Sequence, residues 1–358
     1  MKKKIVPILI VGVLLLVAGA FIGWQMLNPK TGVSGAFEYK LLWNGSAEIT
    51  AYTGNEDHVV VPQIIDGHTV KSIGAKAFWY DNGDFWLVSD APIKSITLPD
   101  TVTSIGEGAF YGRANMTSID IPEDVTFIGS HAFYECGLTS IVIPKGVTTI
   151  APYAFAYCEA LTDVELPDTI RTIGENAFSG CYRLTEMELP DKLSTIGEFA
   201  FSVTGLTGVE IPVGVSNIGT MAFAYSDLTS VRIPDDTTGL GENPFAYCER
   251  LTDIQVSANH PTLKVVGGVL FEKIEKKLLC YPAGLTATAY DVTLDTAAIG
   301  AEAFSGSKYL TSVKIPASVK KIGEVAFGSC PNLTLKVAPG SVAKQYAVNN
   351  NIPFEDVE

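Results

Sequence analysis

One short unit recurs through most of this chain, and this repetition constrains the fold more than any other feature. Written with x for any residue, the unit is I-G-x-x-A-F-x-x-C-x-x-L-T-x-V-x-I-P-x-x-V-x-x. Its phenylalanine recurs at near-constant spacing, at positions 110, 133, 155, 178, 201, 223 and 245. Self-similarity with a period of roughly 20 to 50 residues indicates a solenoid. The pair Pro244-Phe245 is a degenerate copy of one that occurs intact at Ala77-Phe78, Ala109-Phe110, Ala132-Phe133, Ala154-Phe155, Ala177-Phe178, Ala200-Phe201, Ala222-Phe223, Ala303-Phe304 and Ala326-Phe327.

Each repeat predicts one coil that contains a short strand. In the copy from Leu138 to Pro144 apolar residues take one side, and Pro144 ends the strand because proline donates no hydrogen bond to a sheet. The Ala-Phe pair should fill the interior, and one coil cannot bury it alone. Neighbouring coils should therefore stack about 4.7–4.9 Å apart and share their core. A glycine precedes most of the pairs and predicts a backbone that needs a permissive dihedral angle, at Gly106, Gly129, Gly174 and Gly197.

The repeat resembles that of the BspA-like leucine-rich repeat family, a class of bacterial surface proteins that also occurs in some parasitic protists. The resemblance extends from about residue 36 to the C-terminus. It implies a mainly β solenoid of 22–23-residue repeats, with a hairpin cap at its N-terminus and a cap of one helix and one strand at its C-terminus. The more common leucine-rich pattern carries a buried asparagine after its strand. No asparagine ladder can form here, because that position holds Asp124, Gly146, Thr169, Lys192 and Gly214.

Residues 1–27 predict a membrane anchor. Three lysines precede the uncharged run 5–27, which as a helix would be about 35 Å long and could cross a hydrocarbon core of about 30 Å. Trp24 lies where an interfacial aromatic residue belongs, and the lysines place residues 1–4 in the cytoplasm. The alternative is a secreted protein, released by signal-peptide cleavage near Ala18-Gly19-Ala20. Both interpretations place the repeats outside the cytoplasm.

The remaining chain divides into caps and repeats. The dipeptide Asn44-Gly45 between two apolar runs indicates a hairpin, which should cover the open edge of the first coil. Near the C-terminus, Ser341 is a helix N-cap candidate, and Ile352–Val357 predicts a last strand. We therefore expect a linker at 28–35, the N-terminal cap at 36–72, repeats at 73–335 with an insertion at about 257–289, and the C-terminal cap at 336–358.

Two places break the period. The interval from Phe245 to Phe304 is far longer than one repeat, and Val265–Phe271 and Lys277–Tyr281 predict the two strands of a protruding hairpin within it. The interval from Phe78 to Phe110 is also longer than a repeat needs. This aromatic insert contains Trp79, Tyr80, Phe85 and Trp86. Exposed aromatic residues are enriched at binding hot spots, although the insert could also pack onto the neighbouring cap.

Five cysteines recur at one repeat position, the third after the phenylalanine. Other copies hold Thr204, Ser226 or Ser307 there, which indicates a small side chain with a weak hydrogen bond. Equivalent residues on stacked coils have parallel Cβ vectors, so we expect buried thiols and no disulfides, although Cα separations of about 5 Å are within disulfide range. The five are Cys136, Cys158, Cys181, Cys248 and Cys330.

Composition and motifs exclude several classes of function. Acidic residues outnumber basic ones by 39 to 25, and three of the basic ones precede the uncharged run, so the chain beyond it is strongly acidic. Such a balance argues against nucleic acid and against direct adsorption to anionic lipid head groups. The four histidines are scattered, and no nucleophile elbow, phosphate-binding loop or dinucleotide fingerprint is present. We therefore expect no enzyme activity, no cofactor and no metal site.

The outward positions of successive strands carry a run of carboxylates, which we call the acidic stripe. It is either a solvated face or a site for a cationic or Ca²⁺-dependent partner. With the aromatic insert it forms the candidate partner-binding set of the sequence. The stripe consists of Asp163, Glu165, Glu186, Glu188 and Glu210.

Taken together, the residues predict a single-pass membrane protein whose extracytoplasmic repeats bind a partner without chemistry. The resemblance to surface adhesins implies a protein or glycan ligand on host matrix or on neighbouring cells. A structural spacer or assembly protein of the cell envelope is the second hypothesis, and an enzyme is the third.

Overall fold

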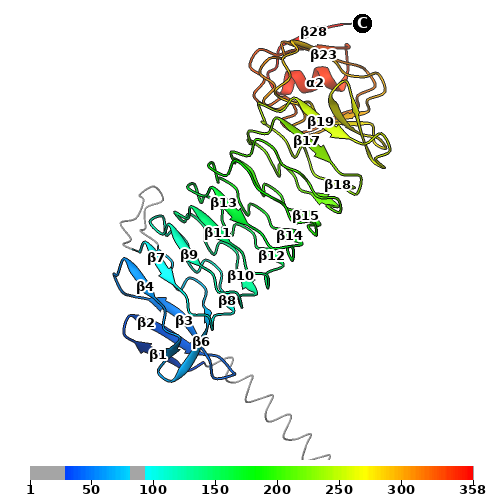
Figure 1. Ribbon diagram of the computed structural model, residues 1–358. Helices are drawn as coiled ribbons and strands as arrows, with labels where there is room; N and C mark the ends of the chain where they lie inside the picture. The colour runs from blue at the N-terminus through cyan, green and yellow to red at the C-terminus, as the bar shows by residue number, and fades with distance from the viewer. Residues whose placement is uncertain (1–28, 81–92, 358) are drawn as a thin grey trace, which may run out of the picture.

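The computed structural model describes residues 29–80 and 93–357, which form one elongated solenoid with the two termini at opposite ends (Figure 1). The secondary structure is mainly β, as predicted, and the one helix of the described residues belongs to the C-terminal cap. Among the residues described, no helix has both the length and the apolar composition that a membrane crossing requires. The predicted anchor at 5–27 lies outside these residues.

Most coils contribute two short strands, which stack into two parallel ladders on different sides of the solenoid (Figure 1). The first ladder holds the strands of the V-x-I-P motif, and the second holds the strands that precede the repeat glycine. First-ladder strands are β4 (His58–Val60), β7 (Ser95–Thr97), β9 (Ser118–Asp120), β11 (Ser140–Val142), β13 (Asp163–Glu165), β17 (Ser230–Ile233) and β19 (Asp253–Val256). Second-ladder strands are β6 (His68–Ile73), β8 (Ser104–Ile105), β10 (Phe127–Ile128), β12 (Thr149–Ile150), β14 (Thr172–Ile173), β15 (Thr195–Ile196), β16 (Asn217–Ile218) and β18 (Gly239–Leu240).

From Tyr52 to Phe245 a continuous stack of aromatic rings fills the interior. From Phe110 to Phe245 the rings of successive coils lie with centroids 5.2–6.0 Å apart, and each ring is almost completely buried. Tyr52 of the cap heads the stack, because its ring stacks on Phe78 at 5.4 Å. The backbone follows the same register: the N–H of Phe178, for example, donates to the carbonyl oxygen of Ala200 at 2.8 Å. Each phenylalanine is therefore shared between coils, as the repeat predicted.

The repeat glycines serve close packing and not a special dihedral angle, so that prediction was wrong. A Cβ atom on Gly106 would lie 2.5 Å from the backbone nitrogen of Ala75, and one on Gly197 would lie 2.6 Å from that of Glu175. The left-handed backbone occurs two positions later, where most copies have no glycine, as at His131 (φ 57°). Only glycine lets the backbones of adjacent coils approach this closely.

The N-terminal cap is larger than predicted. β2 (Phe37–Leu41) and β3 (Ala47–Tyr52) pair antiparallel across the Asn44-Gly45 turn, and β3 pairs with β6. The expected linker is wrong for half of its length, because β1 (Thr31–Ser34) pairs antiparallel with β2 and forms the edge of this sheet. The short strand β5 (Ile64–Ile65) completes the cap by pairing with β6.

The insertion differs from the single hairpin predicted. β20 (Leu263–Val266) and β21 (Val269–Glu272) form a hairpin around Gly267 and Gly268, whose φ angles are +60° and +82°. The run Val265–Phe271 is thus a turn between two strands and not one strand. β22 (Lys277–Cys280) pairs antiparallel with β21 but also parallel with β24 (Ala298–Ile299), so it belongs to the resumed repeats.

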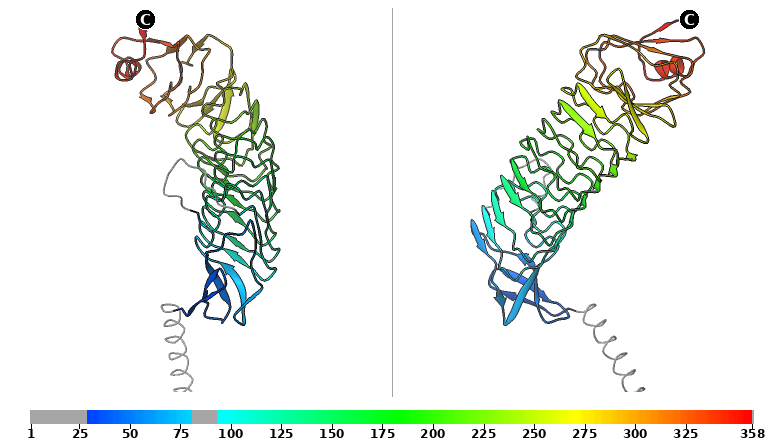
Figure 2. Two further views of the ribbon diagram at one scale, coloured as in Figure 1. Left: turned by 90° about the vertical axis from the view of Figure 1, so that its left-hand side faces the viewer. Right: turned by 45° about the vertical axis from the view of Figure 1, so that its right-hand side comes forward.

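Tyr281 fills a phenylalanine position that the sequence pattern missed. It precedes Phe304 by the length of one repeat. Its ring stacks on that of Phe304 at 5.3 Å, and its N–H donates to the carbonyl oxygen of Ala303 at 2.7 Å. The C-terminal coils are inclined to the rest of the solenoid (Figure 2).

The last coils continue into a C-terminal cap of the predicted kind. β25 (Ser312–Ile315) pairs parallel with β23 (Ala289–Asp291) and with β27 (Thr334–Val337), and β26 (Lys321–Ile322) pairs with β24. The helix α2 (Val342–Asn349) follows, and the Ser341 side chain accepts a hydrogen bond from the Lys344 N–H at its start. β28 (Phe354–Asp356) then pairs parallel with β27.

Candidate functional site

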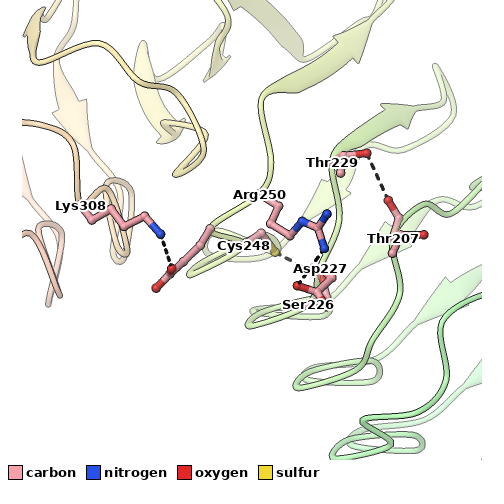
Figure 3. A network of polar contacts seen from close by, with 8 residues as sticks. Thr207, Ser226, Asp227, Thr229, Cys248, Arg250 and Lys308 are labelled. Atoms are coloured by element: carbon pink, nitrogen blue, oxygen red, sulfur yellow. Dashed lines mark hydrogen bonds and ion pairs between the residues drawn. The ribbon is translucent and has the colours of Figure 1, made fainter.

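The repeated cysteine position is structural. Cys158 Sγ donates to the carbonyl oxygen of Phe133 at 3.0 Å, and the other four cysteines of the series make the same contact with the preceding coil. Burial raises the pKa of Cys158 to about 12, and all the cysteines are free thiols, as predicted. Where Ser226 replaces cysteine, its hydroxyl hydrogen-bonds Cys248 at 3.3 Å (Figure 3). A buried, protonated thiol that bonds the backbone is suited to packing and not to nucleophilic chemistry.

No catalytic or metal-binding constellation emerges from the described parts of the chain. There, no group of three or more His, Cys, Asp or Glu side chains is placed to hold a metal ion. Of the histidines, His260 is buried, and its Nε2 lies 3.1 Å from the carbonyl oxygen of Pro234 while its Nδ1 accepts the backbone N–H of Leu263 at 3.0 Å. These contacts anchor the start of the insertion. The exterior of the solenoid is therefore the remaining place for a functional site.

All five residues of the acidic stripe are exposed. Asp163 and Glu165 lie on β13, where they pair with Ser140 and Val142 of β11. Glu210 pairs with Arg232 of β17 in an isolated parallel bridge, so a basic residue ends the run. Along these outward positions, successive coils therefore carry carboxylates as far as Glu210 and then the guanidinium of Arg232.

The first ladder is interrupted inside the acidic stripe. Residues 184–190, which carry Glu186 and Glu188, form no strand, whereas the second ladder continues from β12 to β18 past the same coils. Carboxylates at directly opposite positions repel one another, which disfavours close strand pairing here. The first ladder also breaks between β9 and β11, where no two carboxylates face each other. The stripe is therefore a run of charges on loosely paired backbone, and not the regular ladder that the repeat predicted.

The aromatic insert is only partly described, because Phe85 and Trp86 lie outside the described residues. Trp79 is 38 % exposed, and the Lys76 ammonium lies 4.0 Å from its ring centroid. Tyr80 is half-buried, with the guanidinium of Arg113 at 5.4 Å from its ring centroid. Arg113 is buried, and it occupies the repeat position that holds cysteine in other coils, the third after the phenylalanine. Its Nε donates to the carbonyl oxygen of Phe78 at 2.5 Å.

Trp79 begins a chain of ring contacts on the exterior that was not predicted from the sequence. Its ring contacts Tyr111 at 6.0 Å, Tyr111 stacks on Tyr134 at 4.6 Å, and Tyr134 contacts Tyr157 edge-on at 5.4 Å. The signal was present, because the residue after the Ala-Phe pair is aromatic in the coils of Phe78, Phe110 and Phe133.

Carboxylates accompany these rings. Burial raises the pKa of Glu135, and the nearby charge of Glu159 raises it further. Burial also raises the pKa of Tyr182, with Glu159 and Tyr157 as the next contributors. Tyr157 and Tyr182 are 40 % and 47 % exposed. The exterior of these coils therefore combines tyrosine rings with carboxylates that repel one another.

The equivalent positions in later coils hold ion pairs. Lys308 Nζ lies 2.8 Å from Glu249 Oε2, and Arg250 lies 3.9 Å from Asp227, each pair connecting two coils (Figure 3). Both pairs are largely exposed, so each stabilises the fold by about 1 kcal/mol or less. The two pairs show that a carboxylate on this face of the solenoid can bind the cationic side chain of an adjacent coil.

Comparison with known proteins identifies the repeat. Residues 87–187, 172–287 and 272–347 match the family model of the BspA-type leucine-rich repeat region, with six copies. A comparison with curated proteins gives no significant match.

Solved structures of bacterial leucine-rich repeat proteins are also similar. A leucine-rich cell surface protein from Faecalibacterium prausnitzii A2-165 is 26 % identical with a TM-score of 0.52, over 90 % of this chain and 98 % of that chain. A leucine-rich repeat protein from Bacteroides ovatus is 24 % identical with a TM-score of 0.49, over 91 % of this chain and 100 % of that chain.

Proposed function

The chain belongs to the BspA-type leucine-rich repeat family, and from this premise we propose that it is a non-catalytic surface protein whose solenoid binds a partner outside the cytoplasm. The partner is a protein or glycan of the host matrix or of a neighbouring cell, and the biological role is adhesion. The segment 5–27 tethers the chain to the membrane with its N-terminus inside.

One observation carries the proposal: interior positions repeat while the exposed positions between them vary. Val142 and Glu165 face each other on adjacent strands of the first ladder, and Glu210 and Arg232 face each other at an isolated bridge. These equivalent exposed positions therefore carry apolar, acidic or basic side chains. The buried phenylalanines of the same coils are all in the same stack. A constant core with a variable exterior is how repeat proteins build extended binding surfaces.

A structural spacer in the cell envelope is the second candidate. It would need only the stacked core, the caps and a tether, and it would leave the exposed charges without a partner. The Faecalibacterium prausnitzii relative is a cell surface protein by name, which supports location more than mechanism.

The experiment is a binding screen. Full-length chain in a non-ionic detergent is immobilised and probed with extracellular matrix proteins, glycans and whole cells. Saturable binding that weakens in the triple variant Glu165→Gln, Glu186→Gln, Glu188→Gln supports the proposal. The matched control removes the same charge elsewhere on the surface, through Glu123→Gln, Asp124→Asn and Asp191→Asn, which are all exposed. Folded protein that binds none of these probes favours the spacer.

A further inference from the structure

Five side chains on the exterior of the coils from His131 to Leu184 form what we call the tyrosine–glutamate surface. They are Tyr134, Glu135, Tyr157, Glu159 and Tyr182. We propose that this surface binds lysine or arginine side chains of a partner protein. The inference rests on the proposed binding function but concerns different residues from those of the acidic stripe.

The surface is built by consecutive coils. Tyr134 and Tyr157 are in edge-on contact at 5.4 Å, and Glu135 follows Tyr134 directly in a left-handed backbone conformation (φ 56°). Glu159 and Tyr182 each occupy the fourth position after the phenylalanine of their coil, so they are neighbours along the stack. The influence of Glu159 on the titration of Glu135 also places the two carboxylates close together.

The Tyr157 ring is held in place by the next coil. A Cβ atom on Gly180 would lie 2.7 Å from Tyr157 Cδ1, so the ring covers the position where another residue would have its side chain. Gly180 itself has φ +77°, a conformation that favours glycine. The ring face is therefore oriented before any partner arrives, which lowers the entropic cost of binding.

The same chain provides an internal template for the ligand. Glu249 occupies the position that Glu159 occupies in its own coil, the fourth after the phenylalanine. The coil stacked next to Glu249 supplies Lys308, whose Nζ lies 2.8 Å from Glu249 Oε2 and 5.5 Å from the ring centroid of Tyr309. The ammonium thus contacts a carboxylate and a tyrosine ring at once.

At the tyrosine–glutamate surface, no lysine occupies the repeat position that Lys308 holds in the later coil. The coil stacked next to Glu159 has Tyr182 where the later coil has Lys308. No ion pair involving Glu135 or Glu159 occurs within residues 29–80 and 93–357. The residue after Tyr182 is the exposed Arg183, which occupies the position of Tyr309 and forms no ion pair with Glu159 among the described residues. Two exposed tyrosines and two carboxylates therefore combine the kinds of group that surround Lys308, a carboxylate and a tyrosine ring, and a partner can supply the cation.

The chemistry selects a cation over other ligands. A guanidinium or ammonium over a tyrosine face is attracted by the ring quadrupole, and nearby carboxylates add to this attraction. Anionic ligands meet two carboxylates and a chain with a formal net charge of −14. The Lys76 ammonium lies 4.0 Å from the ring centroid of Trp79, at the start of the chain of ring contacts that includes Tyr134 and Tyr157.

The test uses fluorescently labelled hexalysine and hexaglutamate amides with the full-length chain in a non-ionic detergent. Fluorescence anisotropy at low salt measures the dissociation constant. The site variant combines Glu159→Gln with Tyr182→Ala, and its matched control combines Glu249→Gln with Tyr309→Ala. All four side chains are exposed, and circular dichroism checks that each variant remains folded. The acidic-stripe triple variant is measured in parallel, and a neutral hexasaccharide serves as a competitor.

Binding of hexalysine but not hexaglutamate, weakened about fivefold by the site variant and less than about twofold by the control, is the expected result. Equal weakening by site variant and control shows only diffuse attraction to an acidic chain and overturns the inference. Weakening by the acidic-stripe variant alone also overturns it but leaves the proposed function intact. Absence of hexalysine binding contradicts the inference. Displacement of bound hexalysine by the neutral hexasaccharide also contradicts it, in favour of a carbohydrate ligand.

Discussion

The ring of Phe155 stacks on the ring of Phe178 with centroids 5.4 Å apart and planes inclined by 7°. Because the N–H of Phe155 also donates to the carbonyl oxygen of Ala177 at 2.9 Å, ring stacking and backbone pairing share one register. The energy of each coil is therefore inseparable from that of its neighbours, as expected for a one-dimensional array. The exterior, in contrast, can change residue by residue without disturbing this register.

The cysteines should be unreactive in the folded chain. At pH 8 iodoacetamide should modify Cys158 and Cys248 only after unfolding, because burial raises their pKa values to about 12 and about 11 and leaves little thiolate. Cys330 is partly exposed and should react first. Mass spectrometry over a time course, with and without urea, measures this. Rapid labelling of Cys158 in folded protein, or a disulfide to Cys136 or Cys181, contradicts the parallel arrangement.

The same raised pKa values predict alkaline sensitivity. The folded thiols keep their protons above their ordinary pKa of 9.0, whereas the unfolded chain releases them. This contribution to stability is fully present below about pH 9 and is lost as pH rises toward 11 to 12. Urea unfolding at pH 8 and pH 10 should show a lower free energy of unfolding at the higher pH. Replacing Cys158 by Ser should reduce the difference.

Tyr281→Phe should stabilise the protein by about 1–2 kcal/mol. The hydroxyl of Tyr281 is buried and has no hydrogen-bond partner among the described residues, so the variant removes an unsatisfied polar group and keeps the ring in the stack. The matched control is Tyr39→Phe, which should lower stability because the Tyr39 hydroxyl donates to Asp66 at 2.8 Å. Urea denaturation measures both. A loss of stability in Tyr281→Phe would indicate a partner for its hydroxyl.

The acidic stripe should be dispensable for folding. The variant Glu165→Gln, Glu186→Gln, Glu188→Gln should leave the free energy of unfolding unchanged or raise it by less than about 1 kcal/mol, because like charges at facing positions repel. Any gain should shrink at high salt, where this repulsion is screened. Thermal denaturation at two ionic strengths tests this. If the variant unfolds, the outward assignment of these side chains is wrong.

The N-terminal segment should remain on the mature protein. We expect the chain to fractionate with membranes and to keep residues 5–27, since this uncharged run is long enough to span a bilayer. Mass spectrometry of the purified protein identifies its first residue. A mature form that begins near Phe21 would replace the anchor by a cleaved signal peptide and leave the interpretation of the repeats unchanged.

The repeat predicted the interior well, because residues that recur at a constant spacing in the sequence stack on one another in successive coils. The register of Phe110 to Phe245 and the cysteine hydrogen bonds follow from it, whereas the C-terminal cap was predicted from Ser341, from Ile352–Val357 and from the family resemblance. Tyr281 was missed because a tyrosine after a cysteine does not match the Ala-Phe pair, although its distance from Phe304 along the chain is that of one repeat. The turn at Gly267 and Gly268 was missed because the surrounding apolar run has the composition of one strand.

The exterior was harder to predict, because it depends on which residues of different coils meet. Trp79, Tyr111 and Tyr134 share one repeat position, but Tyr157 lies one residue later in its coil, so that position alone reveals only part of this chain of ring contacts. Repulsion between facing carboxylates disfavours strand pairing at Glu186 and Glu188, and this is a contribution that strand propensity does not contain. The role of the repeat glycines likewise depends on a contact between coils and not on a local preference.

The central claim is that successive coils share one buried phenylalanine stack and leave function to the exterior. The most direct measurement compares urea unfolding of Phe178→Ala with that of Phe127→Ala, because Phe178 is completely buried whereas Phe127 on β10 is 57 % exposed. We predict a loss of about 3–5 kcal/mol for Phe178→Ala, and a loss below about 1 kcal/mol for Phe127→Ala. A loss below about 1 kcal/mol for Phe178→Ala, or equal losses for the two variants, would contradict the claim.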